Sequence, residues 1–243
     1  MMAEVKPYRN SSSGKKAQVA EMFDNIAPKY DFLNHFLSFG IDKLWRKRAI
    51  KLIKRFNPKH ILDVATGTGD FAIAGLKTGA KKVTGIDISE EMLAVGRKKI
   101  EKLGLSGKIS LQKGDSEAIA FDENSFDAVT VAFGVRNFEN LSRGLDEIYR
   151  VLKPDGTICV LEFSKPRLFP VKQFYNIYSY YTLPFFGRLF SKDKSAYSYL
   201  PESVEAFPDG NEFLTYLGKS GFVGAYEKRQ TFGVATIYIG KKM

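Results

Sequence analysis

The chain has 243 residues, which is long enough for one well-buried α/β domain with an appendage but short for two independent domains. Its single cysteine, Cys159, excludes an internal disulfide, and no apolar run reaches the roughly 20 residues that a membrane-spanning helix needs. The net charge of +10 is uneven, because residues 1–60 hold 13 Lys and Arg against 5 Asp and Glu. Residues 1–14 lack the apolar core of a signal peptide, so we expect a cytoplasmic protein.

The leading segment is predicted to be a tail followed by helices. Residues 1–16 are expected to form a flexible basic tail, because the run from Ser11 to Gly14 is too polar to pack. Short helices are predicted over residues 17–26 and 32–39, and a longer one over residues 42–56.

The predicted helix over residues 42–56 repeats apolar side chains at helical spacing, with cations between them. The favoured interpretation is a surface helix whose apolar stripe packs on the sheet and whose charges are solvated. A second interpretation is attraction of the cations to anionic lipid headgroups. Nucleic-acid binding ranks last, because the helix has no basic run interleaved with exposed aromatic residues and no known binding module is recognised.

From residue 60 onward, predicted strands and helices alternate. The strands span residues 60–65, 81–87, 108–113, 124–133 and 155–163, and the helices span 68–78, 89–103 and 140–152. Strands separated by helices imply a parallel sheet with helices on both faces. Residues 221–229 and 231–240 add an antiparallel hairpin at the sheet edge. We therefore predict one Rossmann-like α/β domain over residues 17–243, with a mostly parallel seven-stranded sheet and an antiparallel C-terminal hairpin.

The first predicted strand runs into a glycine turn, Ile61-Leu-Asp-Val-Ala-Thr-Gly-Thr-Gly69, and the second ends in Asp87. Gly67 and Gly69 lack the Cβ atoms that would keep a ligand away from the backbone, and Asp87 can accept hydrogen bonds from two ribose hydroxyls. Asp63 would repel a pyrophosphate but attract the ammonium group of S-adenosylmethionine, which favours that cofactor over a dinucleotide. Two alternatives stay open: a nicotinamide-dependent oxidoreductase that uses the same turn, and a turn that holds no nucleotide.

Residues 164–205 do not fit the alternating core pattern. The aromatic residues concentrated there are Phe174, Tyr175, Tyr178, Tyr180, Tyr181, Phe185, Phe186, Phe190, Tyr197 and Tyr199. They either cover the edge of the sheet or line a wide apolar pocket after the fifth strand, where open α/β sheets bind ligands. We favour the pocket and treat the segment as an aromatic substrate-pocket insertion.

Several stretches resemble the motifs of the menaquinone/ubiquinone biosynthesis C-methyltransferases. They are Tyr30–Arg46, Phe133–Asn137, Arg150–Ser164 and Ala196–Ser203. The likeness covers nearly the whole chain from about Met22. It departs at Asp155, where Gly is common, and at Asp42, where the family usually has His. The second departure puts a proton-transfer role at that position in doubt.

The resemblance implies a class I methyltransferase fold, S-adenosyl-L-methionine as cofactor, and methylation of a ring carbon of a polyprenylated quinol. The substrate would be demethylmenaquinol, giving menaquinol, a methoxy-benzoquinol of ubiquinone biosynthesis, or both. Alternatives are a methyltransferase for a sterol or another small molecule and a lipid-binding module without catalysis. We also expect peripheral contact with the inner membrane surface and no nucleic-acid partner, and a homodimer is left open.

The resemblance also assigns roles to individual residues. The cofactor-binding set is Asp63, Thr66, Gly67 and Gly69 for the methionine part, Asp87 for the ribose, and Asp115 and Ser116 for the adenine edge. Arg136 is expected to steady a phenolate, with a salt bridge at the strand end as the alternative. Tyr30 and Asp31 are catalytic candidates on a helical lid, residues 17–58, or else only cap their helix. Two histidines and one cysteine predict no metal site.

Overall fold

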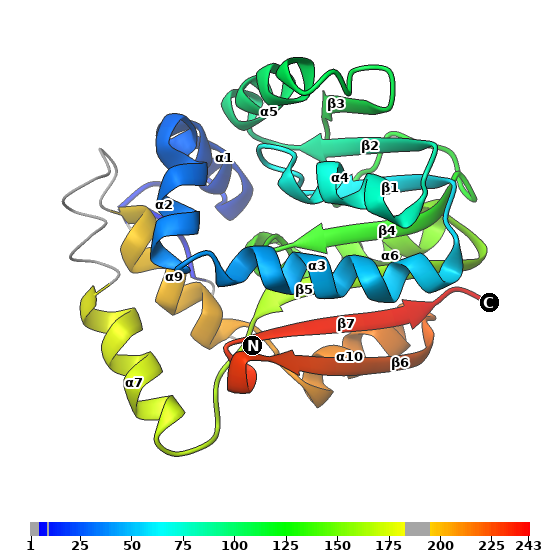
Figure 1. The fold of residues 1–243 in the computed structure, drawn as a ribbon. Coiled ribbons are helices and arrows are strands. Elements are labelled where there is room, and N and C mark those ends of the chain that lie inside the picture. Colours follow the sequence, from blue (N-terminus) through cyan, green and yellow to red (C-terminus); the bar gives the residue numbers. More distant parts are fainter. Residues whose placement is uncertain (1–4, 9, 183–194) are drawn as a thin grey trace.

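The computed structural model describes residues 5–8, 10–182 and 195–243, without the side chains of Leu33, Tyr181, Thr182 and Tyr197. Its centre is a seven-stranded sheet in the order β3-β2-β1-β4-β5-β7-β6 (Figure 1). The strands are β1 (His60–Val64), β2 (Lys82–Asp87), β3 (Ile109–Lys113), β4 (Phe126–Ala132), β5 (Leu152–Phe163), β6 (Val223–Gln230) and β7 (Ala235–Lys241). Strand β7 is antiparallel to both β5 and β6, and the other pairs are parallel, so the predicted sheet is confirmed.

Helices cover both faces and one end of this sheet. They are α1 (Lys15–Ile26), α2 (Tyr30–Leu37), α3 (Ile41–Ile53), α4 (Asp70–Gly75), α5 (Glu90–Lys102), α6 (Leu141–Val151), α7 (Val171–Ile177), α9 (Ser195–Ala206) and α10 (Asn211–Lys219). A π-helical turn, Tyr178–Thr182, follows α7, and a 3-10 turn, Thr231–Gly233, joins β6 to β7. Within the described residues, no helix is both long and apolar enough to cross a membrane.

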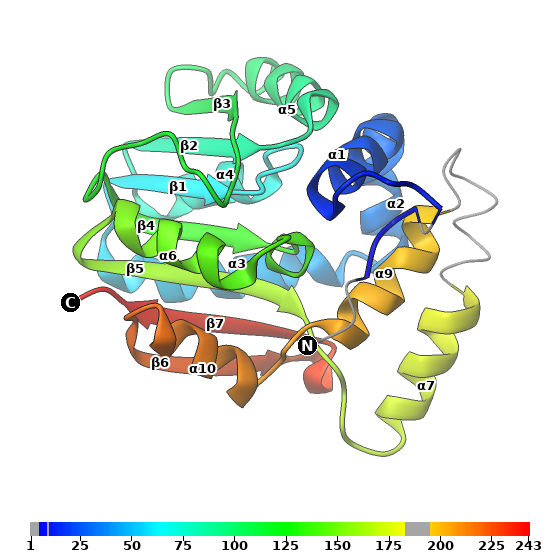
Figure 2. The same ribbon diagram turned by 180° about the vertical axis from the view of Figure 1, so that it is seen from behind.

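The alternating strand pattern creates two apolar cores. Ile61 of β1 packs with α3, α4 and α5 on one face, whereas its neighbour Leu62 packs with α6 and α10 on the other. Figure 2, the view from behind, shows α6 and α10 lying over the second face. Both side chains are fully buried, which explains why these strands read as continuous apolar runs rather than as alternating ones.

Helix α3 is the predicted basic helix. Its apolar stripe, which includes Trp45, Ala49 and Ile53, is buried in the first core. The exposed positions carry Lys43, Lys47 and other cations. The stripe therefore anchors the leading segment to the sheet, in agreement with the favoured interpretation of this helix.

Two helices near the ends of the chain differ from the sequence-based prediction. Helix α1 begins at Lys15 rather than at residue 17, and the backbone N–H of Tyr8 donates a hydrogen bond to Gln18 Oε1 at 2.9 Å. Helix α10 lies where no helix was predicted. Its buried Phe213 and Leu217 are one helical turn apart, and this spacing is the signal that would have indicated the helix.

The strand order reverses between β1 and β4, because β1 connects onward to β2 on one side and the chain returns with β4 on the other. Open α/β sheets bind ligands at the carboxyl ends of the strands at such a switch point. Helices α1, α2, α7 and α9 stand beyond this end of the sheet in both ribbon views (Figures 1 and 2). They enclose the candidate site.

Candidate active site

The turn after β1 and the end of β2 form one hydrogen-bonded unit. Gly67, whose φ is +56°, donates its backbone N–H to Asp87 Oδ2 at 2.7 Å. The backbone N–H of Ser89 donates to Asp87 Oδ1 at 2.9 Å. Burial raises the pKa of Asp87 to about 6, against the effect of these bonds. The carboxyl group is thus fixed at the wall of a cleft, which we call the Asp87 cleft. Its oxygens can accept further hydrogen bonds from a ligand.

The Asp87 cleft is closed on one side by helix α1. Its walls include the predicted residues Gly67, Asp115 and Ser116 as well as Met92 and Phe138. Lys16 of α1 places its Nζ 2.7 Å from Asp115 Oδ2 and 3.4 Å from Glu117 Oε2. Neither Lys16 nor Glu117 was predicted from the sequence, because the pairing joins residues about a hundred positions apart.

A second cleft, the Asp63 cleft, lies on the other side of the glycine turn. Asp63 accepts hydrogen bonds from Thr66 Oγ1 and Thr130 Oγ1, each at 2.6 Å. Burial raises its pKa to about 6, although both hydroxyl bonds oppose that shift. Asp31, Asp70 and Arg46 also line this cleft. The cleft therefore offers three carboxyl groups and one cation, which is the charge pattern that suits a zwitterion.

The predicted glycines differ in their position relative to these clefts. Gly67 lines both of them. Gly69, with φ +81°, is absent from the cleft walls in the part of the chain described, and an added Cβ there would lie 3.4 Å from Leu111 Cδ1. Gly69 thus serves the turn and the packing of the following helix.

Arg46 is a site residue to which the sequence analysis gave no role. Its Nη1 contacts Asp42 and lies 3.7 Å from Asp70 Oδ2. Its Nε is buried and has no hydrogen-bond partner among the described residues. An unpartnered buried donor in a cleft wall is a costly arrangement that an anionic ligand group would relieve.

Polar contacts tie helix α2 to the glycine turn. Asp31 Oδ1 accepts from Thr68 Oγ1 at 2.5 Å, and Asp31 Oδ2 lies 2.5 Å from Lys99 Nζ. His35 Nδ1 lies 2.9 Å from Asp42 Oδ2. Burial alone would raise the pKa of Asp42, but the Ser38 hydroxyl and the Arg46 charge lower it. Asp42 therefore serves as the anionic partner in this network.

An apolar cavity of about 370 Å³, the aromatic cavity, adjoins both clefts. Its described aromatic walls are Phe23, Tyr30, Phe39, Trp45, Phe133, Phe163, Phe174, Tyr175, Tyr178 and Tyr199. Four of these residues come from the predicted insertion, while Tyr180 is exposed at the surface. Phe185, Phe186 and Phe190 lie outside the described residues, as do the side chains of Tyr181 and Tyr197.

Tyr30 stands where these spaces meet, because it lines both clefts and the aromatic cavity. Burial raises the pKa of its hydroxyl, while the charge of Arg136 and a hydrogen bond with Asn34 oppose the shift. The hydroxyl therefore stays protonated near neutral pH and can donate a hydrogen bond. Asp31, its neighbour in the chain, lines the Asp63 cleft but is not among the described residues that line the aromatic cavity.

Arg136 lines the aromatic cavity, and its side chain is only 8 % exposed. Its Nη1 donates to Glu162 Oε1 at 2.8 Å and to the backbone oxygen of Phe133 at 2.5 Å. Its Nε is buried without a hydrogen-bond partner among the described residues. Glu162 is fully buried, and burial raises its pKa while Arg136 opposes that effect. The salt bridge predicted as an alternative is present, and it leaves Nε of the same side chain without a partner among the described residues.

The sheet order and the clefts at its switch point define a class I S-adenosylmethionine-dependent methyltransferase fold. A protein of Thermotoga maritima described as an S-adenosylmethionine-dependent methyltransferase, possibly for histamine, superposes with a TM-score of 0.63 over 92 % of this chain and 99 % of its own at 18 % identity. A putative methyltransferase of Methanococcus maripaludis gives a TM-score of 0.60 over 97 % of both chains at 22 % identity.

Sequence comparison narrows this class to a family. The ubiE/COQ5 methyltransferase family model matches residues 11–242, and the chain belongs to this family. A Bacteroides fragilis protein named demethylmenaquinone methyltransferase is 51 % identical over 98 % of both chains. A Geotalea daltonii protein named ubiquinone/menaquinone biosynthesis C-methyltransferase UbiE is 47 % identical over 97 % of this chain and its own full length. The protein is therefore an S-adenosylmethionine-dependent methyltransferase.

Proposed function

We propose that the protein transfers the methyl group of S-adenosyl-L-methionine to a ring carbon of demethylmenaquinol, giving menaquinol. The observation that carries this proposal is the aromatic cavity of about 370 Å³, which meets the two clefts at Tyr30. An apolar cavity of this size suits a naphthoquinol with an isoprenoid tail better than a small polar acceptor. The names of the relatives at 44–51 % identity support the same substrate.

We assign the cofactor one direction across the two clefts. Asp87 accepts hydrogen bonds from the ribose hydroxyls, and Asp115 and Ser116 contact the adenine edge in the Asp87 cleft. The methionine part occupies the Asp63 cleft, where Thr66 and the glycine turn lie beside the acids. Arg46 Nε is the donor for the methionine carboxylate, because it is buried and otherwise without a partner among the described residues.

When bound, S-adenosylmethionine supplies an electrophilic methyl group on a sulfonium. Loss of a phenolic proton to solvent would place negative charge on the adjacent ring carbon, which would then accept the methyl group of the bound cofactor. The ring carbon would release its proton and the phenolic oxygen would regain one, so aromaticity returns and one proton is released overall. Arg136 stabilises the phenolate through its unused Nε, and Tyr30 orients the ring between cavity and cofactor. The apolar walls exclude water from the reacting atoms.

Residues 17–58 act as a lid in this proposal. The Asp87 and Asp63 clefts have volumes of about 60 and 30 Å³, and each volume is too small for a nucleoside. Lys16 holds α1 across the first cleft, and Asp31 holds α2 across the second. Both contacts are partly exposed ion pairs, which are weak enough to break when the cofactor enters.

A methoxy-benzoquinol of ubiquinone biosynthesis is the second candidate substrate. The observation that favours it is the name of the Geotalea daltonii relative, which covers both quinones. Either substrate is dissolved in a membrane, so we also propose that the enzyme works in the cytoplasm at the inner membrane surface.

Substrate choice can be tested directly with the purified protein. It would be incubated with S-adenosylmethionine and, separately, reduced demethylmenaquinone and reduced demethylated methoxy-benzoquinone, with ring methylation followed by mass spectrometry. The oxidised quinones are the matched controls, because they lack a phenolic proton and should give no product. A methylated naphthoquinol supports the main proposal, and a methylated benzoquinol alone supports the second. If neither quinol reacts while the cofactor still binds, both substrates are wrong.

A further inference from the structure

Large apolar side chains are exposed around the mouth of the aromatic cavity. They are Phe32, Phe36 and Phe39 on and after α2, Leu168, Phe169, Phe174 and Ile177 on α7 and the loop before it, and Phe232 between β6 and β7. Phe169 is 81 % exposed, Phe39 79 % and Phe232 72 %. We refer to this set as the aromatic face. Isolated exposed apolar residues are ordinary, but a contiguous set marks an interaction surface.

The three groups of the aromatic face adjoin one another. The Tyr178 hydroxyl donates to the backbone oxygen of Leu37 at 2.5 Å, and the rings of Phe39 and Tyr178 lie 6.4 Å apart, so the end of α2 meets the end of α7. Ser164 Oγ donates to the backbone oxygen of Gly233 at 2.8 Å, which joins the 3-10 turn to the start of the α7 loop. In Figure 1, α2 and α7 flank the same side of the molecule.

The aromatic face continues into the aromatic cavity. Phe39 and Phe174 are exposed on the outside and also line the cavity. Val171 at the start of α7 and Thr231 of the 3-10 turn line it as well. The aromatic face and the aromatic cavity therefore share side chains, and the cavity wall reaches the surface at Phe39 and Phe174.

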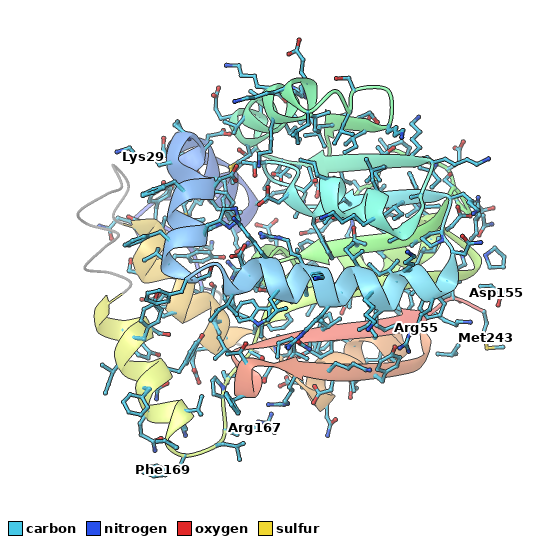
Figure 3. All side chains as sticks on the ribbon, in the orientation of Figure 1. Lys29, Arg55, Asp155, Arg167, Phe169 and Met243 are labelled. Carbon is cyan, nitrogen blue, oxygen red and sulfur yellow. The ribbon has the colours of Figure 1, made fainter. Side chains whose placement is uncertain are left out.

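Cations lie beside the aromatic face. Residues 163–180 contain three of them, Lys165, Arg167 and Lys172, and no Asp or Glu. Lys165 Nζ and Arg167 Nη2 lie 3.5 and 3.9 Å from the buried carboxylate of Asp209. The acids of α2 and α3 near this end are already neutralised, because Asp31 pairs with Lys99 and Asp42 with Arg46. In Figure 3, Arg167 and Phe169 are labelled at the lower end of this side of the molecule. Lys29, which is exposed, is labelled at its upper end.

We propose that the aromatic face docks on the surface of a bilayer that contains anionic lipids. Its apolar side chains enter the boundary between headgroups and acyl chains, while the cations beside it contact the lipid phosphates. That the substrate is dissolved in the membrane rests on the proposed function. The docking of the aromatic face on a bilayer does not depend on that function. This surface differs from the one suggested by the sequence, which was the cationic face of α3.

The test is flotation of the full-length protein with vesicles of phosphatidylcholine alone or mixed with phosphatidylglycerol. The triple variant Leu168→Ser, Phe169→Ser, Phe232→Ser removes exposed side chains that are absent from the described walls of the aromatic cavity. Loss of three apolar side chains that would be partly inserted in the bilayer should reduce partitioning at least tenfold. The matched control is Leu103→Ser, because Leu103 is exposed at the end of α5, away from the face.

A charge-reversal pair separates the electrostatic contribution. Lys172→Glu should weaken binding to vesicles with phosphatidylglycerol and leave weak binding to phosphatidylcholine unchanged, whereas Lys102→Glu on α5 should change neither. Methylation of a quinol with a truncated, water-soluble tail should be equal in all variants and the wild type. Unchanged vesicle binding of the triple variant would overturn the proposal. So would a stable dimer that buries this face and fails to float. Absence of methylation in every protein would instead overturn the substrate assignment.

Discussion

The backbone N–H of Gly67 and the carboxylate of Asp87 are joined by a 2.7 Å hydrogen bond that links the turn after β1 to the end of β2. The bond fixes the carboxylate before any ligand arrives, while burial raises its pKa to about 6. A prearranged acceptor loses little entropy on binding, which is an advantage for a site that must hold two ribose hydroxyls.

We expect Asp87→Asn to weaken S-adenosylmethionine binding at least tenfold. Charge-assisted hydrogen bonds contribute about 1.5–3 kcal/mol each, and the amide can replace the carboxylate only partly. Isothermal titration calorimetry measures the affinity, and a thermal melt checks that the turn has kept its fold. Asp122→Asn, on an exposed loop, is the matched control. Equal affinities for the three proteins would refute the ribose assignment.

Cofactor affinity should fall as the pH is lowered through about 6. Asp63 and Asp87 both have a pKa raised to about 6 from the ordinary 3.8 in the ligand-free protein, so they become protonated below that pH. The loss should approach tenfold per pH unit for each group that must be ionised to bind. These two groups should contribute the opposite trend to the stability of the ligand-free protein, because each holds its proton more tightly in the folded than in the unfolded state between about pH 4 and 6. Calorimetry and thermal melts at matched pH values check both trends, and parallel trends would contradict this account.

Arg46→Gln should distinguish ligands with and without the methionine carboxylate. We expect it to weaken S-adenosylhomocysteine binding at least tenfold, because a charge-assisted contact with buried Nε is lost. Binding of 5′-methylthioadenosine, which lacks the amino-acid group, should change little. The control is Arg48→Gln, since Arg48 pairs with Gln230 outside the clefts. If both ligands weaken equally, Arg46 serves only to hold α3.

Arg136→Met should impair both stability and turnover, and a second substitution can separate the two effects. Removing Arg136 leaves Glu162 buried without its cation, which should cost about 3–5 kcal/mol of unfolding free energy. Adding Glu162→Gln should restore most of that loss, because the uncompensated charge is gone. Turnover should stay about 10²-fold below the wild type in the double variant, because no cation faces the phenolate.

Denaturant unfolding and single-turnover kinetics measure these two quantities. Cofactor affinity should be nearly unchanged in the double variant, because Arg136 is absent from the described walls of both clefts. Recovery of turnover together with stability would show that Arg136 has a structural role only.

Much of the fold followed from local patterns in the sequence. The glycine turn, Asp87 and the apolar strands were recognisable because each depends on neighbours within a few residues. Helix α10 was missed although Phe213 and Leu217 carry a helical spacing, since the segment also contains Gly218 and borders Gly210 and Gly221. Its stability comes from packing on the sheet beside Tyr238, and no local pattern reports such a contact.

The sequence by itself determined the α/β class, the family and the identity of the residues around the switch point, because strand periodicity and short motifs are local properties of the chain. Only the tertiary structure decided which of those residues share a space. It separated Gly69 from the clefts, placed Tyr30 at the junction of both clefts with the aromatic cavity, and left Arg46 Nε without a partner among the described residues. These relationships depend on how helices from distant parts of the chain pack over one edge of the sheet, and burial and charge pairing there are set by contacts in space rather than by distance along the sequence.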